Sequence, residues 1–316
     1  MEPNTTSVPS QPVPQVQPQD ISLGMLEGPF SLFKKTWNFF KSNWKLLVPI
    51  TLLPSVCFAV GQIFSLYGGL VNIIAVALSI LGILFSVALQ PALVDAIHKL
   101  NTGNTTIELV DQYKIGFRLF WSMLLLGIMQ VLVSFGATPL FVVPGIIVGI
   151  YLSMYLYTFV LEGKKGYESL TESYSLVYGR WFDVLVRLLF AGLVYLVMII
   201  AVALTSFVLS MIFGVESDST SYMILSLVLN LIFSSVTGTF VMVYLYNVYL
   251  SLKTTRIPDV DVSVFKKWLV GFTAFGVVVF IGMILILLML VKTIRADLLS
   301  NTKLPDRFVD QSIDLK

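Results

Sequence analysis

The chain has 316 residues, of which 57% are hydrophobic and 12% are charged, whereas about 25% are charged in a typical soluble domain. The net charge is only +2, which excludes the concentrated basic surface that nucleic-acid binding requires, and the single cysteine excludes a disulfide framework or a thiolate metal cluster. The composition therefore predicts an integral membrane protein that contacts membrane lipids and has no nucleic-acid partner.

The N-terminal residues 1–22 are rich in Pro, Gln, Ser and Thr, and no basic region leads from them into an apolar run. This pattern predicts a disordered tail, not a signal peptide. Residues 23–255 are predicted to form a six-span membrane domain, 256–293 a linker and a seventh span, and 294–316 a polar C-terminal tail.

Seven long apolar segments predict membrane-spanning helices, because a hydrocarbon core about 30 Å thick needs about 20 residues. They lie at about 45–67, 71–97, 119–137, 141–162, 183–214, 222–251 and 268–292. Only GATPLF separates the third from the fourth, so a re-entrant hairpin is an alternative to two crossings, although their combined length favours two. The predicted fold class is an all-α polytopic membrane protein.

Lys and Arg predict the orientation, because positively charged loops stay in the cytoplasm. Fifteen of the twenty basic residues lie before the first span or between spans two and three, four and five, or six and seven. The connections at 68–70, 138–140 and 215–221 contain none. The N-terminus is therefore predicted to be cytoplasmic. A seventh crossing would place basic residues of the C-terminal tail outside, which the same rule disfavours, so the side of the C-terminus stays open.

An amphipathic segment is predicted before each odd-numbered span. In GKKGYESLTESYSLVYGRW, residues 163–181, apolar side chains recur at steps of three and four, and the same steps occur in 30–44 and, more weakly, in 109–120. Each copy precedes a span that goes out and another that returns. This organisation predicts three parallel repeats of an interfacial helix plus a two-span hairpin, with the seventh span added.

The aromatic residues of these segments are predicted to anchor the helices at headgroup depth while the polar faces meet the cytoplasm. The predicted anchors are Trp37, Trp44, Tyr174 and Trp181. The alternative is that the segments bind lipid headgroups or a protein partner. Lys34, Lys35, Lys41 and Lys45 in the first copy suit anionic lipid, whereas Glu168 and Glu172 in the third do not.

The stretch FVLEGKKGYESLTESYSLVYGRWFDVLVRLL carries a Leu-Glu-Gly turn, a Ser-rich helix and a closing Gly-Arg-Trp before the next span. With SLFKKTWNFFKSNWKLLVPITLLP near the N-terminus, it resembles the membrane domain of some bacterial glycerophosphodiester phosphodiesterases and related bacterial membrane proteins. The resemblance covers about residues 25–255 and implies a bacterial cytoplasmic membrane. The catalytic barrel of those enzymes, which uses Glu, Asp and two His, is missing, since His98 is the only histidine.

No enzymatic activity and no cofactor are predicted. Clustered His, Cys, Asp and Glu are missing, and no Gly-rich phosphate loop with a Lys occurs. Asp183 and Arg187 are predicted to form an i, i+4 ion pair at interface depth, and no span carries an ionisable residue near its middle, which disfavours an ion-coupled carrier.

Two functional hypotheses follow. The first is a non-catalytic membrane protein that interacts with lipids or assembles with protein partners. The second is a permease for a small or amphiphilic solute, with a polar pocket between the repeats. The candidate pocket residues are Gln90, Gln130, Asn230 and Asn247. Their convergence on one cavity would favour the permease, and separate locations would favour the first hypothesis.

Overall fold

The structure is a computed structural model that describes residues 26–65, 67–104, 107–137, 142–214 and 219–301. These residues form helices and contain no strand. The helices are α1 (Pro29–Ser65), α2 (Val71–Asn101), α3 (Leu109–Ala137), α4 (Val142–Tyr151), α5 (Tyr155–Leu161), α6 (Tyr167–Val177), α7 (Trp181–Phe213), α8 (Thr220–Thr254) and α9 (Ser263–Asn301).

Within the residues that the structure describes, seven segments are long and apolar enough to cross a membrane, when Val143–Leu161 of α4 and α5 is counted as one. The all-α, multi-pass membrane class is thereby confirmed for the described part of the chain. The predicted N-terminal tail, residues 1–22, lies outside the described residues. The C-terminal tail was predicted from residue 294, but α9 continues as a helix to Asn301.

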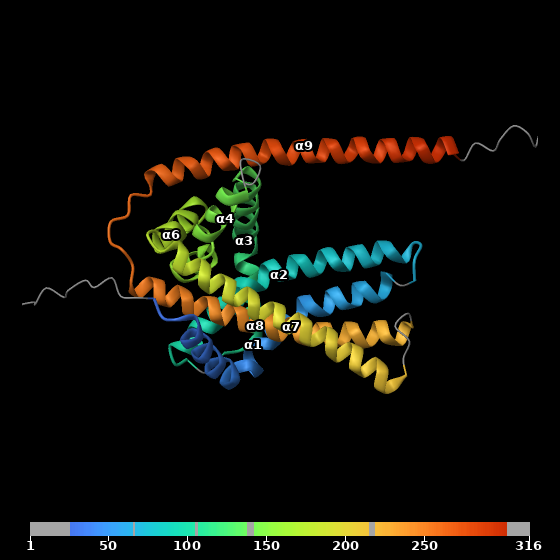
Figure 1. The fold of residues 1–316 in the computed structure, drawn as a ribbon, viewed down its shortest axis with the longest axis horizontal. Helices are drawn as coiled ribbons and strands as arrows, with labels where there is room; N and C mark the ends of the chain where they lie inside the picture. Colours follow the sequence, from blue (N-terminus) through green and yellow to red (C-terminus); the bar gives the residue numbers. More distant parts are fainter. Residues whose placement is uncertain (1–25, 66, 105–106, 138–141, 215–218, 302–316) are drawn as a thin grey trace, which may run out of the picture.

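Two helical hairpins dominate the architecture (Figure 1). Helices α1 and α2 form one, α7 and α8 form the other, and α1 packs against α8 between them. Helix α3 runs across the direction of these hairpins, α4 and α6 gather near the end where α1 begins, and α9 lies along another side of the molecule. The far ends of the hairpins and of α9 expose mostly apolar side chains, as expected for helices that face lipid.

The packed core lies near the end where α1 begins. Four tyrosines in it, Tyr157, Tyr244, Tyr246 and Tyr249, are almost fully buried. The Tyr157 hydroxyl donates to the Met242 carbonyl at 2.9 Å, and the Tyr246 hydroxyl lies 2.9 Å from His98 Nδ1. These bonds fasten α5 and α2 to α8 where polar groups could not otherwise be satisfied.

Hydroxyl groups also join α1 to α8 within the spans. Thr51 Oγ1 lies 3.0 Å from Thr239 Oγ1, and the Ser235 hydroxyl donates to Ser55 Oγ at 3.0 Å. Such interhelical hydrogen bonds stabilise membrane helix pairs by about 0.6 kcal/mol each. They fix the register of the two helices.

The fourth span was predicted as one helix over 141–162, but it is interrupted at residues 152–154 between α4 and α5. Helix α6 supplies hydrogen bonds to the backbone at this break. The Ser173 hydroxyl donates to the Tyr151 carbonyl at 2.7 Å and accepts from the Met154 N–H at 3.1 Å. An irregular backbone is tolerated in a membrane protein when other protein groups satisfy it in this way.

The polar face of α6 was predicted to meet the cytoplasm, but most of its hydroxyl residues are buried. Ser169, Ser173 and Ser175 are buried. The Ser169 and Ser173 hydroxyls donate to the Tyr155 and Tyr151 carbonyls of the α4–α5 segment, whereas Ser175 donates to the Glu172 carbonyl and accepts from Arg256. Gly163 and Gly179 flank α6 with φ of 68° and 74°, a left-handed conformation that glycine adopts without strain. Gly163 lies in the predicted Leu-Glu-Gly turn, and Gly179 lies in the Gly-Arg-Trp that follows the helix.

The three predicted repeats are not equivalent in the structure, and the repeat organisation stays a prediction. In the first two units the amphipathic segment is continuous with its span, as α1 and α3, whereas α6 is separate from α7. The returning span of the second unit is interrupted between α4 and α5, whereas the returning spans of the first and third units, α2 and α8, are unbroken helices.

Helix α9 crosses α3 at two glycines. A Cβ added at Gly136 would overlap the Phe272 carbonyl, and one added at Gly276 would overlap the Leu132 carbonyl. Small residues of this kind let membrane helices approach closely. Beyond this crossing, residues 277–294 of α9 are largely exposed and apolar.

Candidate functional site

The four predicted pocket residues do not share one cavity. Gln90 and Gln130 line a cavity of about 360 Å³ together with Tyr155. Asn230 lines a separate groove between α7 and α8. Asn247 is buried, and its Nδ2 donates to Thr36 Oγ1 at 3.0 Å, so it fastens α8 to α1.

Gln90 also lines a second cavity of about 210 Å³ between α1, α2 and α8, where Thr51, Ser55 and Ser86 contribute hydroxyl groups. The amides of Gln90 and Gln130 make no hydrogen bond to any residue that the structure describes. Neither cavity is lined by a charged residue. These cavities can therefore accept a neutral polar group or water.

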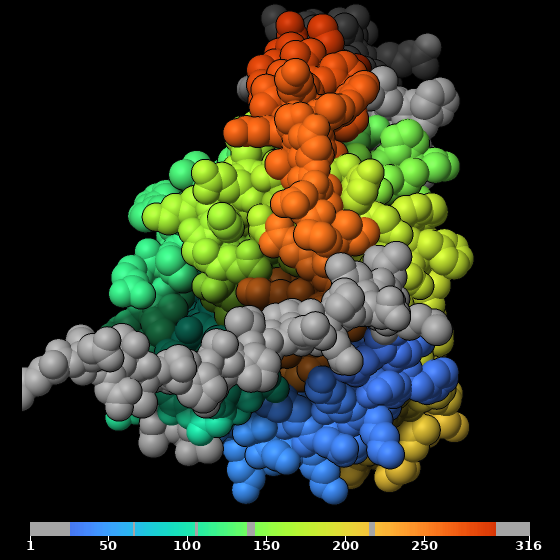
Figure 2. Space-filling model, turned by 90° about the vertical axis from the view of Figure 1, so that its left-hand side faces the viewer, coloured from blue at the N-terminus to red at the C-terminus, as the bar shows by residue number. Residues whose placement is uncertain are grey.

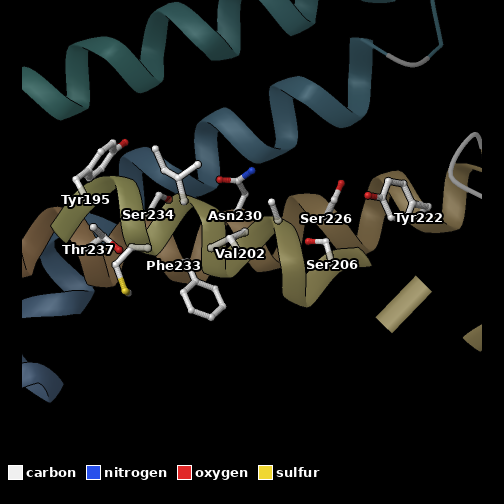
Figure 3. Close-up of a pocket in the computed structure, with 12 residues that line it drawn as sticks. Tyr195, Val202, Ser206, Tyr222, Ser226, Asn230, Phe233, Ser234 and Thr237 are labelled. Atoms are coloured by element: carbon white, nitrogen blue, oxygen red, sulfur yellow. The ribbon is translucent and has the colours of Figure 1, made fainter. Parts of the chain in front are cut away.

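The groove between α7 and α8 has a volume of about 280 Å³ and carries the longest series of polar side chains (Figure 3). Tyr222, Ser226, Asn230 and Ser234 recur every four residues along α8, so they lie on one face of the helix. Figure 3 shows the polar side chains spread along the groove from Tyr222 at one end to Thr237 at the other.

Hydroxyl and amide groups in this groove are incompletely paired. The Ser226 hydroxyl donates to the Met223 carbonyl at 2.8 Å, and the Ser234 hydroxyl donates to the Leu231 carbonyl at 3.2 Å. Within the described residues, the Asn230 amide makes no hydrogen bond. In a hydrocarbon environment an unpaired amide costs several kcal/mol, and Asn230 is exposed, so its amide can pair with a polar group from outside the chain.

A second, apolar cavity of about 90 Å³ adjoins the groove, since Met198 and Thr237 line both. Its other walls are apolar or aromatic side chains from α1, α7 and α8. They are Phe33, Trp37, Phe40, Val194, Val236 and Phe240. The α7–α8 groove thus has a polar wall on α8 and a largely apolar wall on α7, and it adjoins the apolar cavity at its Thr237 end.

The N-terminal half of α1 presents a basic and aromatic surface, and forms the lower part of the face seen in Figure 2. Phe30, Trp37 and Trp44 recur every seven residues and are 76%, 52% and 46% exposed. Lys34, Lys35, Lys41 and Lys45 are exposed beside them. Of these lysines, Lys35 lies 3.6 Å from the Glu27 carboxylate, and the other three have no ion pair among the described residues.

The predicted anchors of the third unit have different surroundings. Tyr174 stacks on Phe265 of α9 with ring centroids 3.9 Å apart, and burial raises the pKa of its hydroxyl. Trp181 is 39% exposed at the start of α7. Tyr174 thus joins α6 to α9, in addition to any contact with the interface.

Arg187 is a buried cation whose main partners are backbone carbonyls. Its Nη2 donates to the Leu26 and Glu27 carbonyls at 2.8 and 2.5 Å, whereas its Nη1 lies 3.9 Å from the Asp183 carboxylate. The predicted interface ion pair is thus a minor contact. Arg187 instead fastens the segment before α1 to α7.

Other ion pairs lie near the packed core. Glu162 accepts from the Tyr249 hydroxyl at 2.6 Å and lies 3.2 Å from Lys253 Nζ, and Lys99 pairs with Asp95 at 2.7 Å. No group of three or more His, Cys, Asp and Glu residues suited to a metal ion occurs within the described part of the chain.

The chain matches no protein-family model, no curated protein and no solved structure. The site must therefore be interpreted from its own residues. Sequence reasoning selected Asn230 because a carboxamide in a span is unusual, but missed Tyr195, Ser206 and Tyr222. The four-residue spacing from Tyr222 to Ser234 was a signal that could have identified the polar face of α8.

Proposed function

We propose that the protein is a non-catalytic component of a bacterial cytoplasmic membrane that acts through contact with lipids, with its N-terminus in the cytoplasm. The observation that carries this proposal is the surface of α1, where unpaired lysines lie beside exposed aromatic rings. Lysines attract anionic headgroups, at about 1 kcal/mol each near a membrane surface, and Trp prefers headgroup depth.

The proposal extends to a relationship with the membrane domain of bacterial glycerophosphodiester phosphodiesterases, without the catalytic barrel. The support is the sequence likeness over about residues 25–255, with Gly163 and Gly179 in left-handed conformations in the segments before and after α6. A protein partner that supplies an activity is compatible with this function, because many membrane domains act by assembly.

The test is retention of anionic lipid by the purified protein. The protein is reconstituted in vesicles of phosphatidylethanolamine and phosphatidylglycerol at 3:1, extracted in mild detergent, and its bound lipids are quantified by mass spectrometry. We expect phosphatidylglycerol to be enriched over the vesicle composition at low salt. The substitutions Lys34→Gln, Lys41→Gln and Lys45→Gln together should return the bound phosphatidylglycerol fraction to nearly that of the vesicles, because about 3 kcal/mol of attraction is removed.

A matched control changes the same number of charges elsewhere, with Lys114→Gln, Lys164→Gln and Lys165→Gln, and should keep the enrichment. High salt should reduce it in the unmodified protein, since exposed charges are screened. Equal retention of phosphatidylglycerol by all three proteins would contradict lipid contact through α1.

A permease is the second candidate, and the cavity shared by Gln90 and Gln130 favours it. The separate locations of Asn230 and Asn247 favour lipid contact instead. A thermal-shift screen with small neutral solutes separates the two functions: a solute whose stabilising effect is abolished by both Gln90→Leu and Gln130→Leu would favour the permease.

A further inference from the structure

Two largely buried residues, Ser206 and Thr237, have hydroxyls that open onto the α7–α8 groove without a partner. Ser206 and Thr237 are 5% and 4% exposed, line the groove, and make no hydrogen bond to any described residue. Hydroxyls in membrane helices usually donate to a carbonyl one turn back, as Thr205 does to Ala201 at 2.7 Å. The unpaired pair indicates that a polar group from outside the chain completes this groove.

The lining defines the charge of that group. Every polar group in the groove is a hydroxyl or a carboxamide, and no residue that lines it is charged. A charged group would be poorly compensated at this depth, whereas hydroxyl and ester oxygens can pair with Asn230, Ser206 and Thr237. The complementary ligand is therefore neutral and carries hydroxyl or ester groups.

The apolar surroundings of the groove indicate that the ligand also has an apolar part. The groove lies between helices whose outer faces are exposed and apolar, and its end at Thr237 opens onto the apolar cavity beneath Trp37. From Tyr222 to Thr237 the polar part extends about 22 Å along α8, at about 1.5 Å per residue. The polar series ends there, so the groove is suited to holding a molecule and not to passing a headgroup across the membrane.

We propose that the α7–α8 groove binds a neutral amphiphile with hydroxyl or ester groups, such as an acylglycerol. Its polar end lies between Tyr222 and Thr237, and the end of its acyl chain enters the apolar cavity of about 90 Å³ lined by Phe33, Trp37 and Phe240. This proposal rests on the proposed function, because both assign lipid binding to the protein. The groove uses different residues from the lysines of α1.

The test is photolabelling with a monoacylglycerol that carries a diazirine near the end of its acyl chain. The protein is reconstituted in phosphatidylethanolamine–phosphatidylglycerol vesicles, irradiated with the probe, and digested for mass spectrometry. We expect the label in the peptides that contain residues 33–40 and 236–240. Asn230→Leu should reduce its yield about five-fold, as expected for loss of one hydrogen bond to the ligand, and Ala203→Phe, which fills the groove, should reduce it about ten-fold.

Two controls make the result specific. Leu204→Phe adds the same ring on the exposed face of α7 and should leave the label unchanged, and so should Asn72→Leu on α2. A phosphatidylglycerol probe with the same diazirine chain should label the groove several-fold less, because its headgroup is charged. Equal labelling by the two probes would overturn the assignment to a neutral ligand.

A label that is spread over all exposed helices, or one that Ala203→Phe does not reduce, would overturn the site. The triple lysine variant should keep the monoacylglycerol label, and Ala203→Phe should keep the phosphatidylglycerol enrichment. Failure of this site and failure of the proposed function are thereby distinguished.

Discussion

Hydroxyls on two sides of α8 have contrasting partners. Ser235 and Thr239 face α1 and are hydrogen-bonded to it, whereas Thr237 lies in the groove and is unpaired. Because all three lie on one helix at similar depth, the contrast reflects the neighbouring helix and not the residue type. It is the reason for treating the α7–α8 groove as a binding site.

Arg187 carries the clearest stability prediction for one residue. Arg187→Lys removes the planar set of donors that serves the Leu26 and Glu27 carbonyls, and should destabilise this attachment by about 1–3 kcal/mol. Hydrogen–deuterium exchange measured by mass spectrometry should become faster in residues 26–35. Arg118→Lys, at an exposed position of α3, is the control. Unchanged exchange in the Arg187 variant would show that these hydrogen bonds do not hold the segment before α1 in place.

The sequence predicted a candidate site residue correctly where the type of side chain alone was sufficient evidence. An amide such as Asn230 stands out in any apolar span, but Asn247 could not be separated from it without knowing that Thr36 lies opposite. Ser206 could not be selected, since serines in membrane helices usually bond to their own backbone. Only the structure shows that this one does not.

At the scale of helices, local periodicity predicted where the helices lie along the chain. Tertiary contacts determined which of their faces are buried. The apolar register of 167–181 predicted a helix, and α6 forms over Tyr167–Val177, but Trp181 belongs to α7 instead. Serines of α6 are buried where α4 and α5 are interrupted beside them. No local sequence pattern predicts the interruption between α4 and α5. The seven apolar segments, in contrast, are predictable because each is defined by its own length and hydropathy.

The crossing of α3 and α9 gives a prediction for a helix pair. Gly276→Leu should force α9 away from α3, because a side chain there would overlap the Leu132 carbonyl. Gly282→Leu, where a Cβ meets open space on the same helix, is the control. In a Cys57→Ala background, oxidative cross-linking between Phe135→Cys and Phe280→Cys reports the contact, since these rings lie 6.5 Å apart.

We expect the cross-link yield to fall at least five-fold with Gly276→Leu and to be unchanged with Gly282→Leu. If both variants cross-link as the parent does, then close approach at the glycines does not hold α9 in place.

At the scale of the whole molecule, the two hairpins carry different surfaces at their two ends. The lysines of α1 lie near the buried core, and the open ends of α7 and α8 expose apolar side chains and the Tyr222 end of the groove. In the predicted orientation, anionic lipid meets α1 on the cytoplasmic side and the groove opens toward the outer half of the bilayer. The lipid proposals therefore depend on the direction in which the helices cross.

Cysteine accessibility tests that direction most directly. In the Cys57→Ala background, single cysteines replace Tyr67, Thr102, Ser219 and Pro258, and intact expressing cells are treated with a membrane-impermeant maleimide. We predict that cysteines at 67 and 219 are labelled in intact cells, and that those at 102 and 258 are labelled only after permeabilisation. Labelling of 102 and 258 in intact cells, with 67 and 219 protected, would contradict the orientation and place the lysines of α1 outside.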